Sequence, residues 1–218
     1  MKIKYMNIEQ IYIINLKTDI TRRNKMLKLI DKYELSKIAT IQFMEAINTY
    51  SIDLPPKEFK GSRLAWGCTL SHLKCLKDAK EKNYKKFIIF EDDIILNYKF
   101  WEMWENLPEC DLLYLGAFQK NWDNINFKEL YYESNFSLGG FAYIILNSII
   151  IERIESLFEI HCKPIDEVLV ELQKEVISYV MYPNLCIANL DASYSKNRII
   201  TMKNYSNKLK WELNNYDI

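Results

Sequence analysis

The chain has 218 residues, 49% of them hydrophobic and 27% charged, which is typical of one globular domain with a proper core and excludes a disordered chain. Lys plus Arg and Asp plus Glu each number 29, so the net charge is zero. The chain therefore lacks the basic surplus that is typical of nucleic-acid-binding proteins. No run is long enough to span a membrane and none resembles a signal peptide, so we expect a cytoplasmic protein without an integral membrane segment.

The cysteines number five, an odd count, and no CxxC pair occurs among them. This spacing argues against a zinc cluster, and we expect reduced thiols.

The first third of the chain predicts alternating strands and helices. Ile11–Leu16 is a short, continuous β-branched run, as in a central parallel strand, and Thr18 or Asp19 is placed to cap a helix from Ile20 to Tyr33. Ile41–Met44 predicts a second strand. Thr49–Gly61, with two prolines, predicts a loop.

A longer helix, Arg63–Lys82, is expected next, capped by Ser62 and apolar on more than one side. Phe87–Phe90 predicts a strand that ends in Glu91-Asp92-Asp93. A helix over Lys99–Asn106 and a strand over Asp111–Gly116 follow.

The second half mixes strands and loops. Loops or a hairpin are expected over Phe118–Ser137. A helix that ends at Phe158 is expected to be capped by Asn147 or Ser148. Pro164 opens another helix that runs to about Lys174. Strands are predicted at Phe141–Leu146, Val176–Met181 and Leu185–Ala188. The pattern predicts one α/β domain over residues 1–218, with a mostly parallel sheet, late antiparallel additions, a core over about 9–195 and a polar tail or surface helix over 196–218.

The acidic run after the strand at Phe87–Phe90 is the strongest functional signal. Like charges so close repel one another, and a divalent cation would remove that cost. Mg²⁺ and Mn²⁺ prefer carboxylate oxygens and share them with substrate phosphates. Ligands of open α/β sheets bind at the carboxyl ends of strands, where Glu91, Asp92 and Asp93 stand. A solvated turn after the strand explains the run equally well when it is taken alone.

Other residues have one functional and one structural interpretation each. Arg22, after Asn15-Leu16, is either a diphosphate ligand or an exposed helix residue. Ser71-His72 lies inside an apolar helix, where a histidine is more often a core residue than a ligand. Asp166 is either a general base or a first-turn acid favoured by the helix dipole. Gly140 permits close approach of a substrate to the backbone or serves a turn.

Taken in order, these segments resemble glycosyltransferase family 25, which includes lipooligosaccharide and procollagen galactosyltransferases. The resemblance extends over about residues 11–195. It rests on five segments: Ile11–Leu16 with Arg22, Gly67–Leu73, Phe90–Ile94, Gly139–Tyr143 and Pro164–Asp166. The Gly67–Leu73 and Phe90–Ile94 segments together are specific for the family, whereas either segment alone is weak evidence.

The resemblance implies a GT-A fold, a UDP-sugar donor, Mn²⁺ or Mg²⁺, inversion at the anomeric carbon and a glycan or hydroxylysine-type acceptor. It implies that Asp93 is the main metal ligand, with Glu91 or Asp92 serving the metal or the ribose, and that Asp166 is the base. Asn15, Leu16 and Arg22 would hold the nucleotide, and Ser71, His72 and Gly140 are further candidates. The chain departs from the family at Trp66 and at Tyr194, where members tend to have acids. If the late acid helps to hold the metal, its role passes to Asp191, to Ser195 or to no residue.

Two other classes remain open. The missing late acid motivates a catalytically impaired binding or scaffold protein of the same fold, which transfer from any UDP-sugar would exclude. A sugar nucleotidyltransferase ranks lower, because Asn15-Leu16-Lys17-Thr18 contains no glycine-rich loop.

Overall fold

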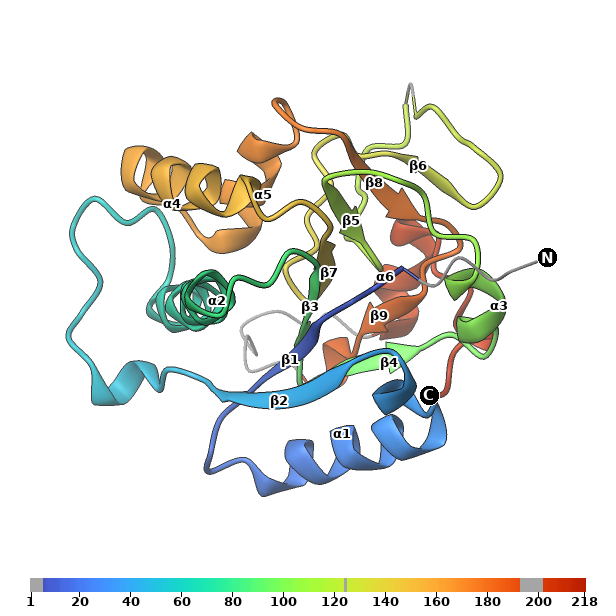
Figure 1. Ribbon diagram of the computed structural model, residues 1–218, viewed down its shortest axis with the longest axis horizontal. Helices are drawn as coiled ribbons and strands as arrows, with labels where there is room; N and C mark the ends of the chain where they lie inside the picture. Colours follow the sequence, from blue (N-terminus) through green and yellow to red (C-terminus); the bar gives the residue numbers. More distant parts are fainter. Residues whose placement is uncertain (1–5, 124, 193–201) are drawn as a thin grey trace.

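The computed structural model describes residues 6–123, 125–192 and 202–218, and their centre is a mixed sheet (Figure 1). Within these residues the sheet has seven strands in the order β2-β1-β3-β7-β5-β8-β6. The strand bounds are β1 Gln10–Asn15, β2 Thr40–Glu45, β3 Phe87–Glu91, β5 Leu112–Tyr114, β6 Tyr131–Glu133, β7 Ala142–Ile145 and β8 Ser178–Met181. β2, β1 and β3 are parallel, whereas β7 runs antiparallel to both β3 and β5. The predicted α/β architecture with antiparallel additions is confirmed.

Helices cover both faces of this sheet (Figure 1). On one face, α2, α4 and α5 pack against alternate strand residues such as Tyr12 and Ile89. On the other face, α1 and the C-terminal elements cover Ile13 and Phe90. This follows from the two-residue period of a strand, which sends successive apolar side chains to opposite faces. The helix bounds are α1 Ile20–Lys32, α2 Arg63–Glu81, α3 Phe100–Trp104, α4 Ile150–His161, α5 Ile165–Leu172 and α6 Met202–Leu209.

The predicted caps of the first two long helices agree with the structure. Asp19 Oδ1 accepts from the Arg22 backbone N–H at the start of α1, and Ser62 Oγ accepts from Ala65 at the start of α2. The cap expected for α4 is wrong: Ile149 occupies that position and makes no side-chain cap bond. Asn147 Oδ1 instead accepts from the Ile149 N–H just before the helix.

Two further segments differ from the sequence-based expectation. Residues after Asp93 form a strand, β4 (Ile94–Leu96), that pairs with β9 (Cys186–Ala188) in a small second sheet. The last residues are not a polar tail, because Trp211 and Tyr216 are 4% and 3% exposed and belong to the main core. Among the described residues no helix is both long and apolar enough to cross a membrane.

Short 3-10 turns connect several of these elements. They are η1 Leu35–Lys37, η2 Thr49–Ser51, η3 Leu190–Ala192 and η4 Leu213–Asn215. The second and third lie near the acidic run and the helix beside it: η2 lies against α2 beside the sheet edge, and η3 follows β9.

Candidate active site

The acidic run lies at the carboxyl end of β3, beside the end of β1. The two strands are parallel, with Ile14 opposite Glu91, so Asn15 and Asp92 meet at the same edge of the sheet. Asn15 Nδ2 donates to Asp92 Oδ2 at 2.7 Å, and Arg22 Nη1 donates to Asp92 Oδ1 at 2.6 Å. Arg22 Nη2 also lies 3.4 Å from Asp93 Oδ2. The arginine therefore offsets the charge of both aspartates and fixes Asp92 in place.

Burial sets the protonation behaviour of these acids. Burial raises the pKa of Asp93, the negative charge of Glu91 raises it further, and Arg22 opposes both effects. For Glu91 burial also favours the neutral acid, but the hydrogen bond and charge of His72 outweigh it and hold the pKa of Glu91 below its usual value. Asp93 Oδ1 is buried and has no hydrogen-bond partner among the described residues. An unpaired buried carboxylate oxygen is costly, and a divalent cation would satisfy it, so the residues fit a metal ion.

One face of α2 forms the wall behind this edge. Gly67 lets the loop after β2 lie against the helix, since a Cβ there would be 2.3 Å from Thr49 Cγ2 and 2.8 Å from the Ile47 carbonyl oxygen. Ser71 Oγ completes this contact by accepting from the Ile47 N–H at 2.8 Å and donating to the Gly67 carbonyl at 2.6 Å. Ser71 is 1% exposed, so its hydroxyl joins the loop to the helix.

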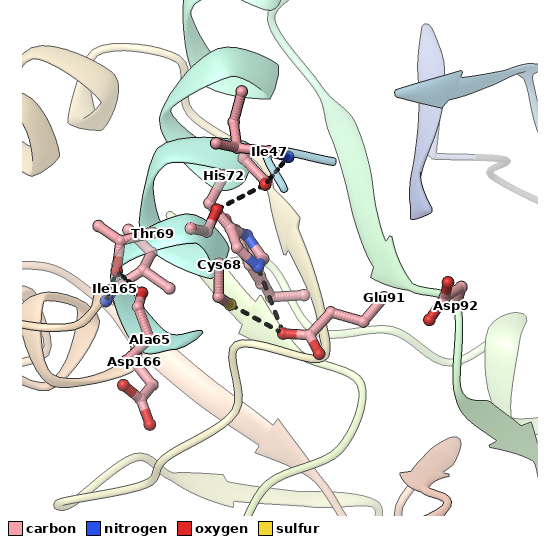
Figure 2. Close-up of polar contacts among 12 residues, drawn as sticks. Ile47, Ala65, Cys68, Thr69, His72, Glu91, Asp92, Ile165 and Asp166 are labelled. Carbon is pink, nitrogen blue, oxygen red and sulfur yellow. Dashed lines mark hydrogen bonds and ion pairs between the residues drawn. The ribbon is translucent and has the colours of Figure 1, made fainter. Parts of the chain in front are cut away.

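His72 supports Glu91 from the same helix. Its Nε2 lies 3.4 Å from Glu91 Oε1 (Figure 2). Its Nδ1 lies 3.0 Å from the hydroxyl of Tyr143 on β7. Cys68, one turn earlier, donates its thiol to the same Glu91 oxygen at 3.5 Å. Burial raises the pKa of that thiol well above its usual value, and Glu91 adds to the effect.

Asp166 approaches from α5, below α2 (Figure 2). The helix that carries it has no side-chain cap of its own, and Thr69 Oγ1 accepts from the Ile165 N–H at 3.0 Å. Burial raises the pKa of Asp166. Gly140 lies between Asp166 and Glu91, since a Cβ on Gly140 would be 3.7 Å from Asp166 Cβ and 3.9 Å from Glu91 Oε1.

A cavity of about 230 Å³ joins these groups. Three carboxylates from separate elements line it, those of Glu91, Asp93 and Asp166, together with Cys68 and Gly140. A second cavity, of about 380 Å³, opens where β1 and β2 end, and it is lined by Leu16, Lys17, Thr18, Glu45, Ala46, Ile47, Asn48, Ser51, Ile52 and Lys74.

The predicted site residues therefore divide into groups. Glu91, Asp93, Asp166 and Gly140 share one cavity, with His72 behind Glu91, whereas Leu16 belongs to the other cavity. Asn15, Arg22 and Asp92 form the bonded group at the strand ends.

Asp191 is not brought to the cavity of the three carboxylates. It is exposed on η3, and its Oδ1 accepts from the Met202 N–H at 3.3 Å. The departure at Tyr194 lies outside the described residues. Sequence reasoning missed Cys68, Thr69 and Tyr143 as site residues. The first two stand inside the Gly67–Leu73 segment and Tyr143 ends the Gly139–Tyr143 segment, so both segments were available signals.

Comparison with known proteins gives a family. The model of "Glycosyltransferase family 25 (LPS biosynthesis protein)" matches residues 8–143, well over half of the chain. Procollagen galactosyltransferase 2 of Mus musculus is 27% identical over 131 residues, and the Homo sapiens protein of that name is 25% identical over 131 residues. Each alignment covers 51% of this chain and 21% of the relative, so the chain spans about a fifth of the length of either.

Two solved structures are distantly similar. One is a glycosyltransferase involved in the glycosylation of the major capsid of PBCV-1 (TM-score 0.41, 11% identity, 70% of this chain and 66% of that one). The other is A197 from STIV (TM-score 0.45, 11% identity, 88% of this chain and 100% of that one). Scores below 0.5 add nothing to the functional argument. The family match, over the segment that contains the strand ends, the Gly67–His72 segment and the acidic run, is sufficient: the chain belongs to glycosyltransferase family 25.

Proposed function

We propose that this protein is an inverting, GT-A-type hexosyltransferase. It moves galactose or glucose from a UDP-sugar to a hydroxyl of a glycan or hydroxylysine-type acceptor, with Mn²⁺ or Mg²⁺. The observation that carries the proposal is the cavity of about 230 Å³ in which Glu91, Asp93 and Asp166 meet, with a buried Asp93 oxygen left without a partner among the described residues. Family membership supplies the reaction class.

Asp93 and Glu91 are the proposed ligands of the cation. Carboxylate oxygens are the donors that Mg²⁺ and Mn²⁺ prefer, and these ions bind together with substrate phosphates. When bound, the cation supplies positive charge that offsets the charge on the departing diphosphate. Asp92 serves as a positioning residue in this scheme, because both of its oxygens are already engaged, by Asn15 and by Arg22.

The nucleotide is proposed to lie in the cavity of about 380 Å³ at the ends of β1 and β2. Ligands of open α/β sheets bind at the carboxyl ends of strands. Leu16 offers apolar surface there, while Lys17 and Lys74 offer positive charge for an anionic ligand. Arg22, at the neighbouring strand end, is proposed to act through Asp92 and Asp93.

Asp166 is the proposed general base. It reaches the cavity from α5, whereas the proposed metal ligands come from β3 and the turn after it. A base on one side of the anomeric carbon and a leaving diphosphate on the other side suit a displacement that inverts the configuration of that carbon. The raised pKa of Asp166, caused mainly by burial, makes its carboxylate a better proton acceptor at neutral pH.

The test is a screen of UDP-sugars for Mn²⁺-dependent hydrolysis and transfer, followed by two variants. Asp166→Asn is expected to lose about 10²–10⁴-fold in transfer, the usual contribution of one general base, and to keep UDP binding by calorimetry. Asp93→Asn is expected to lose Mn²⁺-dependent UDP binding. Glu167→Gln, an exposed neighbour in the same first turn, is the matched control and should behave as wild type.

Three results would contradict the assignments. Wild-type transfer by Asp166→Asn would remove the base, and unchanged Mn²⁺-dependent UDP binding by Asp93→Asn would remove that residue from the metal site. UDP binding without turnover of any UDP-sugar would favour the non-catalytic binding or scaffold protein instead.

A further inference from the structure

The wall of the carboxylate cavity holds a second cluster of metal-ligating atoms. Cys68 Sγ, His72 Nε2 and Glu91 Oε1 all lie within 4.8 Å of one another, which is the one such three-residue group of His, Cys, Asp and Glu in the described parts of the chain. Cys68 and His72 are four residues apart on α2 and so project from one face of the helix. Glu91 meets them from the end of β3 (Figure 2).

The contact between His72 and Glu91 is long for an N–H···O hydrogen bond. The His72 Nε2 to Glu91 Oε1 distance is 3.4 Å, whereas a good N–H···O bond is about 2.9–3.0 Å long. Two donors also converge on the same carboxylate oxygen, since Cys68 Sγ lies 3.5 Å from it.

The same distances match the edges of a zinc tetrahedron. Zinc lies about 2.3 Å from sulfur and about 2.0–2.2 Å from nitrogen and oxygen, which places tetrahedral S···O neighbours about 3.6 Å apart and N···O neighbours about 3.4 Å apart. The distances from Glu91 Oε1 are 3.5 Å to Cys68 Sγ and 3.4 Å to His72 Nε2. The third pair, Cys68 Sγ and His72 Nε2, lies within 4.8 Å, so two of the three edges already have the length that such a cation needs.

We propose that Cys68, His72 and Glu91 form a binding site for a thiophilic divalent cation of the zinc class, beside the Mn²⁺ or Mg²⁺ position proposed at Asp93 and sharing the Glu91 carboxylate with it. Its fourth position faces the cavity that Cys68 and Glu91 line. The Glu91 side chain is 31% exposed there, whereas His72 is fully buried, so an ion enters from the cavity side. The thiol releases its proton when the cation binds, as thiolate sites do.

Tyr143 completes the arrangement behind the histidine. Ligating histidines donate their second ring N–H to an acceptor, which fixes the tautomer and the ring orientation. The Tyr143 hydroxyl lies 3.0 Å from His72 Nδ1 and can accept that proton, leaving Nε2 free for the cation. The two rings also stack, with centroids 5.7 Å apart and planes 18° apart.

This inference does not depend on the proposed transfer reaction, and its test needs no sugar nucleotide. The reduced full chain is titrated with Co²⁺, whose bond to a thiolate gives a charge-transfer absorption and whose tetrahedral sites give strong visible bands. We expect both signals to saturate at one equivalent. Added Zn²⁺ should then displace Co²⁺ and remove them, because such sites bind zinc more tightly than cobalt.

Variants assign the signal to the cluster. Cys68→Ser should lose the charge-transfer band, whereas Cys110→Ser, the matched change at a partly buried cysteine before β5, should keep it. Tyr143→Phe preserves the ring stacking and should weaken Co²⁺ binding about 10- to 100-fold. Asp93→Asn should retain the band, which separates this site from the proposed donor metal. An absent band in the wild type, or a band that persists in Cys68→Ser, would overturn the proposal.

Discussion

Thr69→Val tests how α2 holds the proposed base. The Thr69 hydroxyl is fully buried, accepts from the Ile165 N–H at 3.0 Å and donates to the Ala65 carbonyl at 2.8 Å. The N-cap of α5 is Pro164, which makes no side-chain cap bond. Thr69 therefore satisfies the first backbone N–H of the helix that carries Asp166, one of the four donors a helix start leaves open.

Valine keeps the β-branched shape but removes the hydroxyl. The Ile165 N–H is then buried without its partner, and such a group costs about 1–3 kcal/mol. We expect the free energy of unfolding, measured in urea, to fall by that amount. Because Asp166 follows Ile165 directly, a shift at the helix start also displaces the carboxylate, and misplacement by about 1 Å can cost about 10²-fold in rate.

The assay compares kcat, UDP affinity and unfolding for wild type, Thr69→Val and Thr69→Ser. Serine restores the hydroxyl and should recover most of both losses. UDP affinity should stay unchanged in both variants, because the strand-end residues are untouched. A Thr69→Val protein within about 0.5 kcal/mol of wild type and with unaltered kcat would refute the reasoning, since that is the range of surface changes.

Three other changes test the packing around the site. Gly67→Ala should destabilise the fold, because the new Cβ would lie 2.8 Å from the Ile47 carbonyl oxygen. The overpacking cost of about 1–3 kcal/mol is expected to exceed the helix-propensity gain of about 1 kcal/mol. A variant that is more stable than wild type in urea unfolding would contradict this. Trp211→Ala should cost about 3–5 kcal/mol by thermal or urea unfolding, and a loss below 1 kcal/mol would mean that the C-terminal segment does not pack on the core. Tyr12→Phe removes a 2.6 Å hydrogen bond to Asp78 and should cost about 1–2 kcal/mol at pH 7. Burial raises the pKa of Asp78, but hydrogen bonds from Lys82 and Tyr12 outweigh it and lower the pKa. The contribution is therefore present above about pH 4 and is lost as the pH falls through the lowered value. A difference between wild type and Tyr12→Phe that stays constant over the whole acid titration would contradict the assignment.

Local sequence determined the elements that carry the site. The buried run at Ile11–Ile14 could only be a central strand, and the caps at Asp19 and Ser62 set where α1 and α2 begin, because each of these signals acts within a few residues. The acidic run was recognisable for the same reason. Three adjacent carboxylates at the end of an apolar strand need compensation of some kind, whatever the rest of the fold is.

The compensation itself required the tertiary structure. From the sequence, Arg22 was either a diphosphate ligand or an exposed helix residue. In the structure it pairs with Asp92 and Asp93, about 70 residues along the chain, because β1 and β3 lie side by side. The reversed direction of β7 next to β3 brings Tyr143 behind His72. No pattern within β7 announces either its direction or its neighbour, since strand pairing is a contact between distant segments.

The C-terminal segment shows the same division most clearly. Its composition is polar, and the sequence predicted a tail or a surface helix. The segment does contain helix α6, but Trp211 lies against Phe118 and Phe141, which line the carboxylate cavity. Burial of a few apolar side chains depends on whether a matching surface exists elsewhere in the fold. Sequence alone thus indicated several candidate site residues, but not Cys68, Thr69 or Tyr143. The tertiary structure decided which of them meet, because only the packed sheet and its helices bring Glu91, Asp93 and Asp166 to one cavity.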